Sequence, residues 1–93
     1  MSGRFAFAKG LKEVRFLFCQ TSEQSANVRS FLQRAYPAMK STNPSVPILI
    51  REAQGTSPRM YARFDFGNEK GQSFEGLSEK QIEDTVSQLV NKE

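Results

Sequence analysis

Apolar and polar residues alternate over residues 11–19, as expected for a β-strand. Val14, Phe16 and Phe18 fall on one face, and the opposite face is polar at its start and apolar at its end. A strand of this kind should run from a solvated start to a covered end. The single cysteine of the chain, Cys19, lies at that covered end, where the strand passes into the next element.

After this strand, apolar residues recur at every third or fourth position, which predicts a helix with one inward face over about residues 23–40. Thr21 or Ser22 is suited to cap its start, and Thr21 with Gln24 fits a capping box. Pro37 should kink or end the helix, because it removes a backbone hydrogen bond of the helix interior. The inward residues are Val28, Phe31, Leu32, Ala35 and Met39.

Three further strands are predicted, each with a different pattern. Residues 46–50 are apolar on both faces, which is typical of a buried strand in a parallel pair. Residues 59–66 alternate cleanly, which predicts a half-exposed antiparallel strand. A turn at residues 67–71 then leads to a short edge strand around residues 72–75. The apolar face of the third strand comprises Met60, Ala62, Phe64 and Phe66.

The last element is a helix that should end near residue 91. Ser78 and Gln81 form a capping box, and Leu77 with Ile82 forms a hydrophobic staple around it. The inward stripe of this helix is Ile82, Val86, Leu89 and Val90.

The order of these elements is strand, helix, strand, strand, strand, helix (βαβββα), which predicts an α/β fold. We expect a four-stranded mixed sheet with two helices, and the minimal thioredoxin-like architecture has this order, with a thiol between first strand and first helix. The chain has 93 residues, enough for one domain over residues 11–93 after an amino-terminal arm over residues 1–10.

Composition narrows the chemistry that is available. The chain has no histidine, so the commonest metal ligand and acid–base group is missing, and we expect no zinc or haem cofactor. One cysteine excludes an internal disulfide. The net charge of +3 is a mild basic bias, and the chain has no Lys/Arg cluster. This positive charge is small for a protein that contacts phosphates. No apolar run approaches the ~20 residues of a membrane span.

Four separated stretches resemble one mitochondrial family. They read Leu-Lys-Glu-Val-Arg-Phe at 11–16, Cys-Gln-Thr-Ser at 19–22, Asn-Pro with Pro-Ile-Leu-Ile-Arg-Glu at 43–52, and Ala-Arg-Phe with Phe-Gly at 62–67. The family groups a small thioredoxin-fold accessory subunit of respiratory complex I, the NADH:ubiquinone oxidoreductase, with certain mitochondrial ribosomal proteins. The chain is more similar to the complex I subunit.

This resemblance implies a non-catalytic accessory subunit that stabilises the matrix arm of complex I or assists its assembly. Its partners would be larger subunits of that arm, and it would lie peripherally on the matrix side of the mitochondrial inner membrane. Two alternatives remain: a mitochondrial ribosomal protein, and a monothiol redox domain. We do not expect the chain to bind nucleic acid, because its net charge is small.

The redox alternative depends on Cys19 and Ser22, which have the spacing of a monothiol thioredoxin-type site. Animal members of the family resemble this chain but carry a second cysteine where it has Ala53, so turnover would need an outside thiol. Ser57-Pro58 lies where thioredoxin folds often have a cis proline, whereas most such bonds are trans. We prefer a structural role for Cys19, because cysteine is among the most buried residue types.

Candidate partner contacts come from one strand and from the arm. Arg59, Tyr61 and Arg63 form a basic and aromatic row, and Arg15 joins it from the first strand. Arginine and tyrosine are enriched in interface hot spots, although an ordinary solvated sheet face has the same pattern. From the arm, Phe5 and Phe7 are the remaining candidates.

Overall fold

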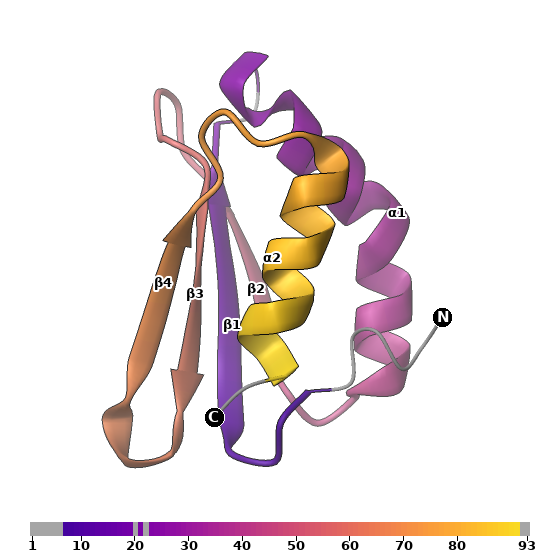
Figure 1. The fold of residues 1–93 in the computed structure, drawn as a ribbon, viewed down its shortest axis with the longest axis vertical. Coiled ribbons are helices and arrows are strands. Elements are labelled where there is room, and N and C mark those ends of the chain that lie inside the picture. Colours follow the sequence, from indigo (N-terminus) through magenta and orange to yellow (C-terminus); the bar gives the residue numbers. More distant parts are fainter. Residues whose placement is uncertain (1–6, 20, 22, 92–93) are drawn as a thin grey trace.

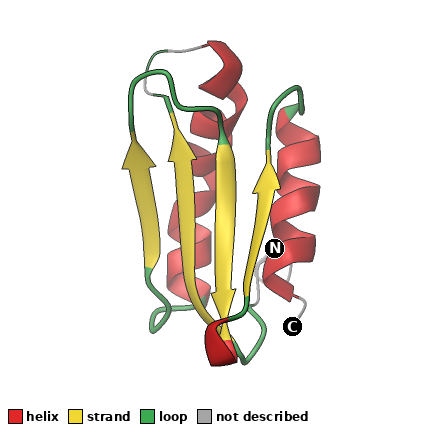
Figure 2. Cartoon of the chain, turned by 90° about the vertical axis from the view of Figure 1, so that its left-hand side faces the viewer, coloured by secondary structure: helices red, strands yellow, loops and turns green. Residues whose placement is uncertain are grey.

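The computed structural model describes residues 7–19, 21 and 23–91, and these form two layers. A four-stranded sheet carries two α-helices on one of its faces (Figure 1), and the view in Figure 2 shows the other face of the sheet in front of the helices. The expected α/β class, with a mixed four-stranded sheet and two helices, is confirmed. The elements are β1 (Leu11–Phe18), α1 (Ala26–Thr42), β2 (Ile48–Glu52), β3 (Arg59–Phe64), β4 (Glu69–Ser73) and α2 (Glu79–Asn91).

The strands lie in the order β2-β1-β3-β4. β1 pairs in parallel with β2 and antiparallel with β3, so the strand that carries the thiol junction is a central one. The expected parallel pair is therefore confirmed. The prediction that residues 46–50 are a buried strand is wrong, because β2 is an edge strand in which Ile50 is 40% exposed. Ile48 faces the core, Leu49 faces the open side of the sheet, and Ile50 lies on the helix side beside α1, where it is only partly covered.

The core lies between the sheet and the two helices. Phe16 of β1 is fully buried, and its ring lies 6.5 Å from that of Phe74, which follows β4. All five predicted inward residues of α1 are buried, which confirms the helical stripe. Each buried aliphatic or aromatic side chain contributes roughly 1.5–3 kcal/mol to folding relative to exposure.

The start of α1 differs from the prediction. The helix begins at Ala26, and residues Glu23–Ser25 form a short 3₁₀ helix instead. Of the residues predicted to cap the helix, Ser22 and the side chain of Gln24 lie outside the described residues. Of the two outcomes predicted for Pro37, an end of the helix is excluded, because α1 continues to Thr42 and buried residues on both sides of the proline anchor it to the core.

The third strand ends earlier than its alternation predicts. Phe64 donates its N–H to the Asn68 carbonyl at 2.6 Å, and a 3₁₀ turn over Asp65–Gly67 lies between them. Phe66 therefore stands at the tip of the turn, fully exposed and with φ of 65°, and the prediction that it belongs to the apolar face is wrong. β4 consequently begins at Glu69 rather than at residue 72, although its expected edge position is confirmed.

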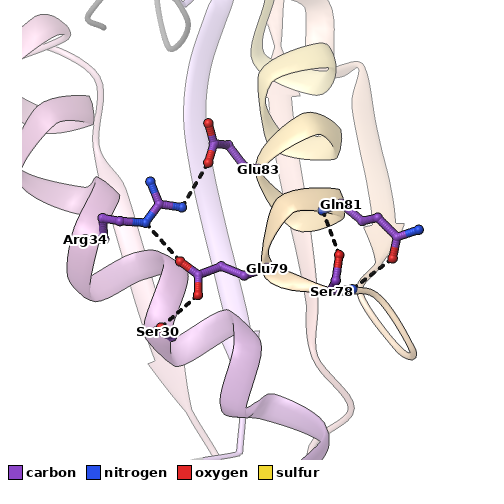
Figure 3. A network of polar contacts seen from close by, with 6 residues as sticks. All are labelled: Ser30, Arg34, Ser78, Glu79, Gln81 and Glu83. Atoms are coloured by element: carbon purple, nitrogen blue, oxygen red, sulfur yellow. Dashed lines mark hydrogen bonds and ion pairs between the residues drawn. The ribbon is translucent and has the colours of Figure 1, made fainter.

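The start of α2 matches the prediction. Ser78 donates its N–H to Gln81 Oε1 at 2.9 Å, and Gln81 returns an N–H to Ser78 Oγ at 3.2 Å (Figure 3). Two backbone donors that the helix leaves free are thereby satisfied. Along the helix, Ile82, Val86 and Val90 are buried, and Leu89 packs beside them as a partly buried residue.

A polar network joins the two helices on their exposed sides (Figure 3). Arg34 of α1 lies 2.9 Å from Glu79 and 2.9 Å from Glu83 of α2, and Ser30 donates to Glu79 at 2.9 Å. These bonds hold the pKa of the Glu79 carboxyl below its ordinary value, with Arg34 as the main cause, and raise the pKa of Arg34. The network aligns α2 with α1 and contributes modestly to stability, because its charges are solvated.

Candidate functional site

Cys19 is held at the end of β1 by several neighbouring segments. Its side chain is buried, its N–H donates to Ser25 Oγ at 3.0 Å, and its carbonyl accepts a bond from Arg29 at 3.0 Å. The Gly55 N–H points at the sulfur, with 3.3 Å between nitrogen and Sγ. The thiol is therefore part of the packing and hydrogen bonding that fix this junction.

Ala53 lies next to this junction. Its N–H donates to the carbonyl of Phe18 at 3.0 Å, so the chain after β2 runs beside the end of β1. Cys19 and Ala53 line the same cavity of about 240 Å³, together with Thr21, Glu52 and Gln54. The fold thus brings residue 53 beside the thiol, but an alanine offers no second sulfur with which Cys19 could form a disulfide.

Two further features bear on the redox alternative. α1 starts seven residues after Cys19, behind a three-residue 3₁₀ helix, so the thiol does not lie in the first turn of a long helix. The bond between Ser57 and Pro58 is trans, since the described residues include no cis peptide. In the part of the chain that the structure describes, no group of three or more His, Cys, Asp or Glu side chains could hold a metal ion.

The predicted contact residues of the strands gather on the sheet face that the helices leave open. Arg15 of β1 pairs in register with Tyr61 of β3, and Arg59 and Arg63 lie two residues to either side of Tyr61. Side chains two residues apart in a strand share one face. These four residues form a single surface, which we call the arginine face, on the side that Figure 2 shows in front.

Tyr61 lies at the centre of the arginine face. The Arg15 guanidinium carbon lies 5.6 Å from the centre of its ring, and Arg59 donates to its hydroxyl at 3.4 Å. The ring also covers Gly71 of β4, where an added Cβ would come within 2.8 Å of the ring carbon Cε1. Glycine at this position therefore lets the ring lie flat across two strands, a role that the sequence alone did not reveal.

Acidic side chains balance only part of the arginine face. Arg63 lies 2.9 Å from Glu13, and Arg15 forms an ion pair with Glu69. Within residues 7–19, 21 and 23–91, Arg59 forms no ion pair with an acid, and its other bond goes to a backbone carbonyl. The face is therefore basic as a whole, with one arginine available to an outside carboxylate.

Phe7 does not belong to this surface. Its N–H donates to Asn43 Oδ1 at 3.1 Å, and its half-buried side chain packs against the core. The neighbouring Ala8 donates its N–H to the Val90 carbonyl at 2.8 Å, so this end of the arm is attached to both helices. Phe5, the other candidate in the arm, lies outside the described residues.

Sequence reasoning expected the apolar end of β1 and the apolar run of β2 to be covered, but the structure leaves both partly open. Leu17 and Leu49 are half-buried on the same open face as the arginines, because the register of the parallel pair places both there. A groove of about 500 Å³ lies between α1 and the edge strand β2, where Ile50 is exposed. The continuous apolar run of residues 48–50 carried this signal, since an edge strand must expose part of such a run.

None of the described helices has the length and apolar character needed to cross a bilayer.

Comparison with known proteins gives consistent matches along the chain. The profile of the mitochondrial ribosomal protein L51 / S25 / CI-B8 domain matches residues 28–79. The NADH-ubiquinone oxidoreductase 10.5 kDa subunit of Neurospora crassa is 73% identical over 90 residues, which cover 97% of this chain and 96% of that protein.

Relatives in plants and animals match over most of their length as well. NADH dehydrogenase [ubiquinone] 1 alpha subcomplex subunit 2 of Arabidopsis thaliana is 44% identical over 90 residues, or 97% of this chain and 93% of the relative. The mouse protein of the same name is 37% identical over 82 residues, or 88% and 83% of the two chains.

Proposed function

The chain belongs to the mitochondrial ribosomal protein L51 / S25 / CI-B8 family, and from its relatives we infer that it is a non-catalytic accessory subunit of mitochondrial NADH:ubiquinone oxidoreductase, complex I. The observation that carries this conclusion is the 73% identity to the 10.5 kDa subunit over nearly the full length of both chains.

We propose that the fold is thioredoxin-like, with the arm at residues 1–10 and the domain at residues 11–93. The support is the placement of the single thiol, which directly follows a central strand and precedes a helix on one sheet face. In this chain the thiol has a structural role, because it is buried and residue 53 beside it is an alanine, which offers no second sulfur.

The role that we propose is to stabilise the matrix arm or assist its assembly, from a peripheral position on the matrix side of the inner membrane. A domain of about 90 residues buries only about 60–65% of the surface that its unfolded chain exposes. Its preformed open sheet face can bury more against a larger subunit without a change of backbone. Docking of a rigid surface costs less conformational entropy than folding on binding.

The arginine face is the proposed contact surface. The ring of Tyr61 lies against the Arg15 guanidinium on one strand and over Gly71 on another, so it is supported from both sides. Arg59 has no acidic partner among the described residues and can bond a carboxylate of the partner as a planar, bidentate donor, whereas Arg63 can do so only in exchange for Glu13. Phe5 and Phe7 stay proposed contacts of the arm, with Phe7 contributing through the part of its side chain that the core leaves exposed.

Charge reversal tests the contact surface in mitochondria of a strain that lacks the chain. We expect Arg59→Glu and Arg63→Glu each to reduce incorporation into complex I on native gels by at least about tenfold, the effect of ~1.4 kcal/mol. Lys80→Glu is the matched control, because this exposed lysine lies on α2, away from the sheet. Equal incorporation of all three variants would exclude the arginine face.

The second candidate is a mitochondrial ribosomal protein, because the family profile is named after such proteins as well. Native gels and sucrose gradients separate the two functions directly. Comigration of the wild-type chain with NADH:ubiquinone oxidoreductase activity supports the subunit. Sedimentation with ribosomes, together with salt-dependent binding of RNA, would support the alternative.

A further inference from the structure

The outer edge of β2 presents backbone groups that no described strand satisfies. The Pro47 carbonyl accepts a hydrogen bond from β1 at 3.1 Å, and the Ala53 N–H donates one to β1 at 3.0 Å. Successive backbone groups of a strand point to opposite sides, so the odd-numbered residues of this segment bond to β1. The N–H and C=O groups of Ile48, Ile50 and Glu52 consequently point to the free edge of the sheet.

An apolar groove runs along the same edge, on the side of α1. Ile50 and Glu52 line it, so the residues with outward backbone groups also place their side chains at the groove. Any chain that paired with this edge would therefore send alternate side chains into the groove. The remaining lining residues are Phe18, Arg29, Leu32, Gln33, Tyr36 and Pro37.

The opposite edge of the sheet lacks this combination. β4 carries Glu69 and Lys70 at its start, and Gly71 offers no side chain to a neighbouring strand. β2 ends with two charged residues as well, so the difference between the edges lies in the glycine, which weakens a strand, and in the apolar residues that β4 lacks. β2 has no glycine, and its apolar residues Ile48, Leu49 and Ile50 form most of its length.

The size of this edge limits what can bind it. Five residues span about 17 Å, and a strand of that length cannot bury the ~1,200 Å² of a stable dimer by itself. An edge strand alone is therefore too small to hold a second copy of the chain. The edge is large enough for a short segment of a protein that is already bound to another surface of this chain. Such tethering raises the effective concentration of the segment at the edge.

Charge indicates the chemistry of the segment. Arg51 is exposed, extends to the same open face as the arginine face, and forms no ion pair within the described residues. On the groove side, the positive Arg29 and the negative Glu52 balance each other. A residue opposite Ile50 would thus meet an apolar, neutral groove, whereas its neighbour in sequence would meet Arg51.

We propose that the edge of β2 binds an extended segment of a neighbouring complex I subunit as a fifth strand, with an apolar residue in the groove and an adjacent acidic residue at Arg51. This inference rests on the proposed function, since it takes the subunit docked at the arginine face as the source of the segment. Such strand addition combines backbone hydrogen bonds for affinity with a side-chain pocket for specificity.

A proline at Glu52 tests the strand pairing. Glu52→Pro removes an outward N–H without removing a bond to β1, and Glu52→Ala removes the same carboxylate but keeps the N–H. We expect incorporation of the proline variant into complex I to fall by about tenfold relative to the alanine variant, through a lost backbone bond and the bulk of the ring. Urea unfolding of the two purified variants checks that both fold.

A second substitution tests the groove. Ile50→Glu keeps the backbone and places a charge at the groove, and it should show the same loss of incorporation.

A photo-crosslinking residue in place of Ile50 identifies what lies on the edge in the intact complex. We expect a crosslink to an extended segment of another subunit. The residue that forms the crosslink should have an acidic residue next to it in that segment. A crosslink to a second copy, or to residues 1–6 of the same chain, would overturn the proposal. If the wild-type chain comigrates with complex I and Glu52→Pro assembles as well as Glu52→Ala, this inference alone fails. If the wild-type chain does not comigrate, the proposed function fails with it.

Discussion

Removing the hydroxyl of Ser25 by the substitution Ser25→Ala is the strongest single test of how the junction around Cys19 is stabilised. Ser25 is the one fully buried polar side chain in the described part of the chain, and its Oγ accepts the Cys19 N–H at 3.0 Å. Although Ser25 precedes α1, its hydroxyl makes no capping bond to the helix. The substitution Ser25→Ala therefore perturbs the junction and leaves the capping of the helix unchanged.

The magnitude follows from the burial of this bond. Removing the acceptor leaves the Cys19 N–H without a partner away from water, which costs about 1–3 kcal/mol. Loss of a helix cap would cost about 1 kcal/mol, but Ser25 makes no such bond. We expect Ser25→Ala to lower the free energy of unfolding by about 2 kcal/mol. For a domain of this size, each kcal/mol lowers Tm by about 4–8 °C.

Urea unfolding of the purified chain measures the effect. A loss of about 2 kcal/mol shifts the urea midpoint by about 1 M if the m-value is unchanged. Ser73→Ala is the matched control, because Ser73 Oγ accepts the Glu75 N–H at 3.2 Å but both groups are exposed. Water can replace that bond, so the control should change stability by less than about 0.5 kcal/mol. Equal effects of the two substitutions would refute the importance of the buried bond.

Two further predictions concern the helices. Hydrogen bonds from Arg34 and Ser30 lower the pKa of the Glu79 carboxyl in the folded state. The stabilisation that these bonds give is therefore fully present above the unfolded pKa of about 4.3. It is lost as the pH falls through the lower pKa of the folded state. The difference in unfolding free energy between wild type and Glu79→Gln should therefore vanish on acidification, and a difference that grew would contradict this reasoning. Pro37→Ala should raise the free energy of unfolding by about 1–3 kcal/mol in urea titrations, because Pro37 lies exposed inside α1 and has no N–H to donate to the helix. A lower free energy of unfolding would show that the helix depends on the proline.

The sequence predicted those features that local periodicity determines. The stripe of α1, the alternating inner face of β1 and the reciprocal caps of Ser78 and Gln81 were all correct. In each case the side chains involved lie within one element. Arg15 beside Tyr61 could be anticipated as one surface, because the patterns of both strands put them on the polar face.

Features that depend on neighbouring elements were not predicted. Phe66 continues the alternation of β3, but a tight turn begins before it because Phe64 bonds to Asn68. Residues 48–50 look like a buried strand, and only the sheet order makes β2 an edge. The contact of Tyr61 with Gly71 depends on the pairing register of β3 and β4, which a single sequence does not reveal.

Stability and assembly are coupled in a domain of this shape. Both helices cover one face of the sheet and leave the other face open (Figure 2). Leu17, Leu49 and Tyr61 are half-buried on the open face. A partner that covers this face stabilises the folded chain by mass action, because it binds the folded state alone. A core substitution such as Ser25→Ala therefore lowers the amount of assembled subunit without touching the interface. Loss of incorporation in a surface variant indicates a contact only when its unfolding free energy equals that of its matched control.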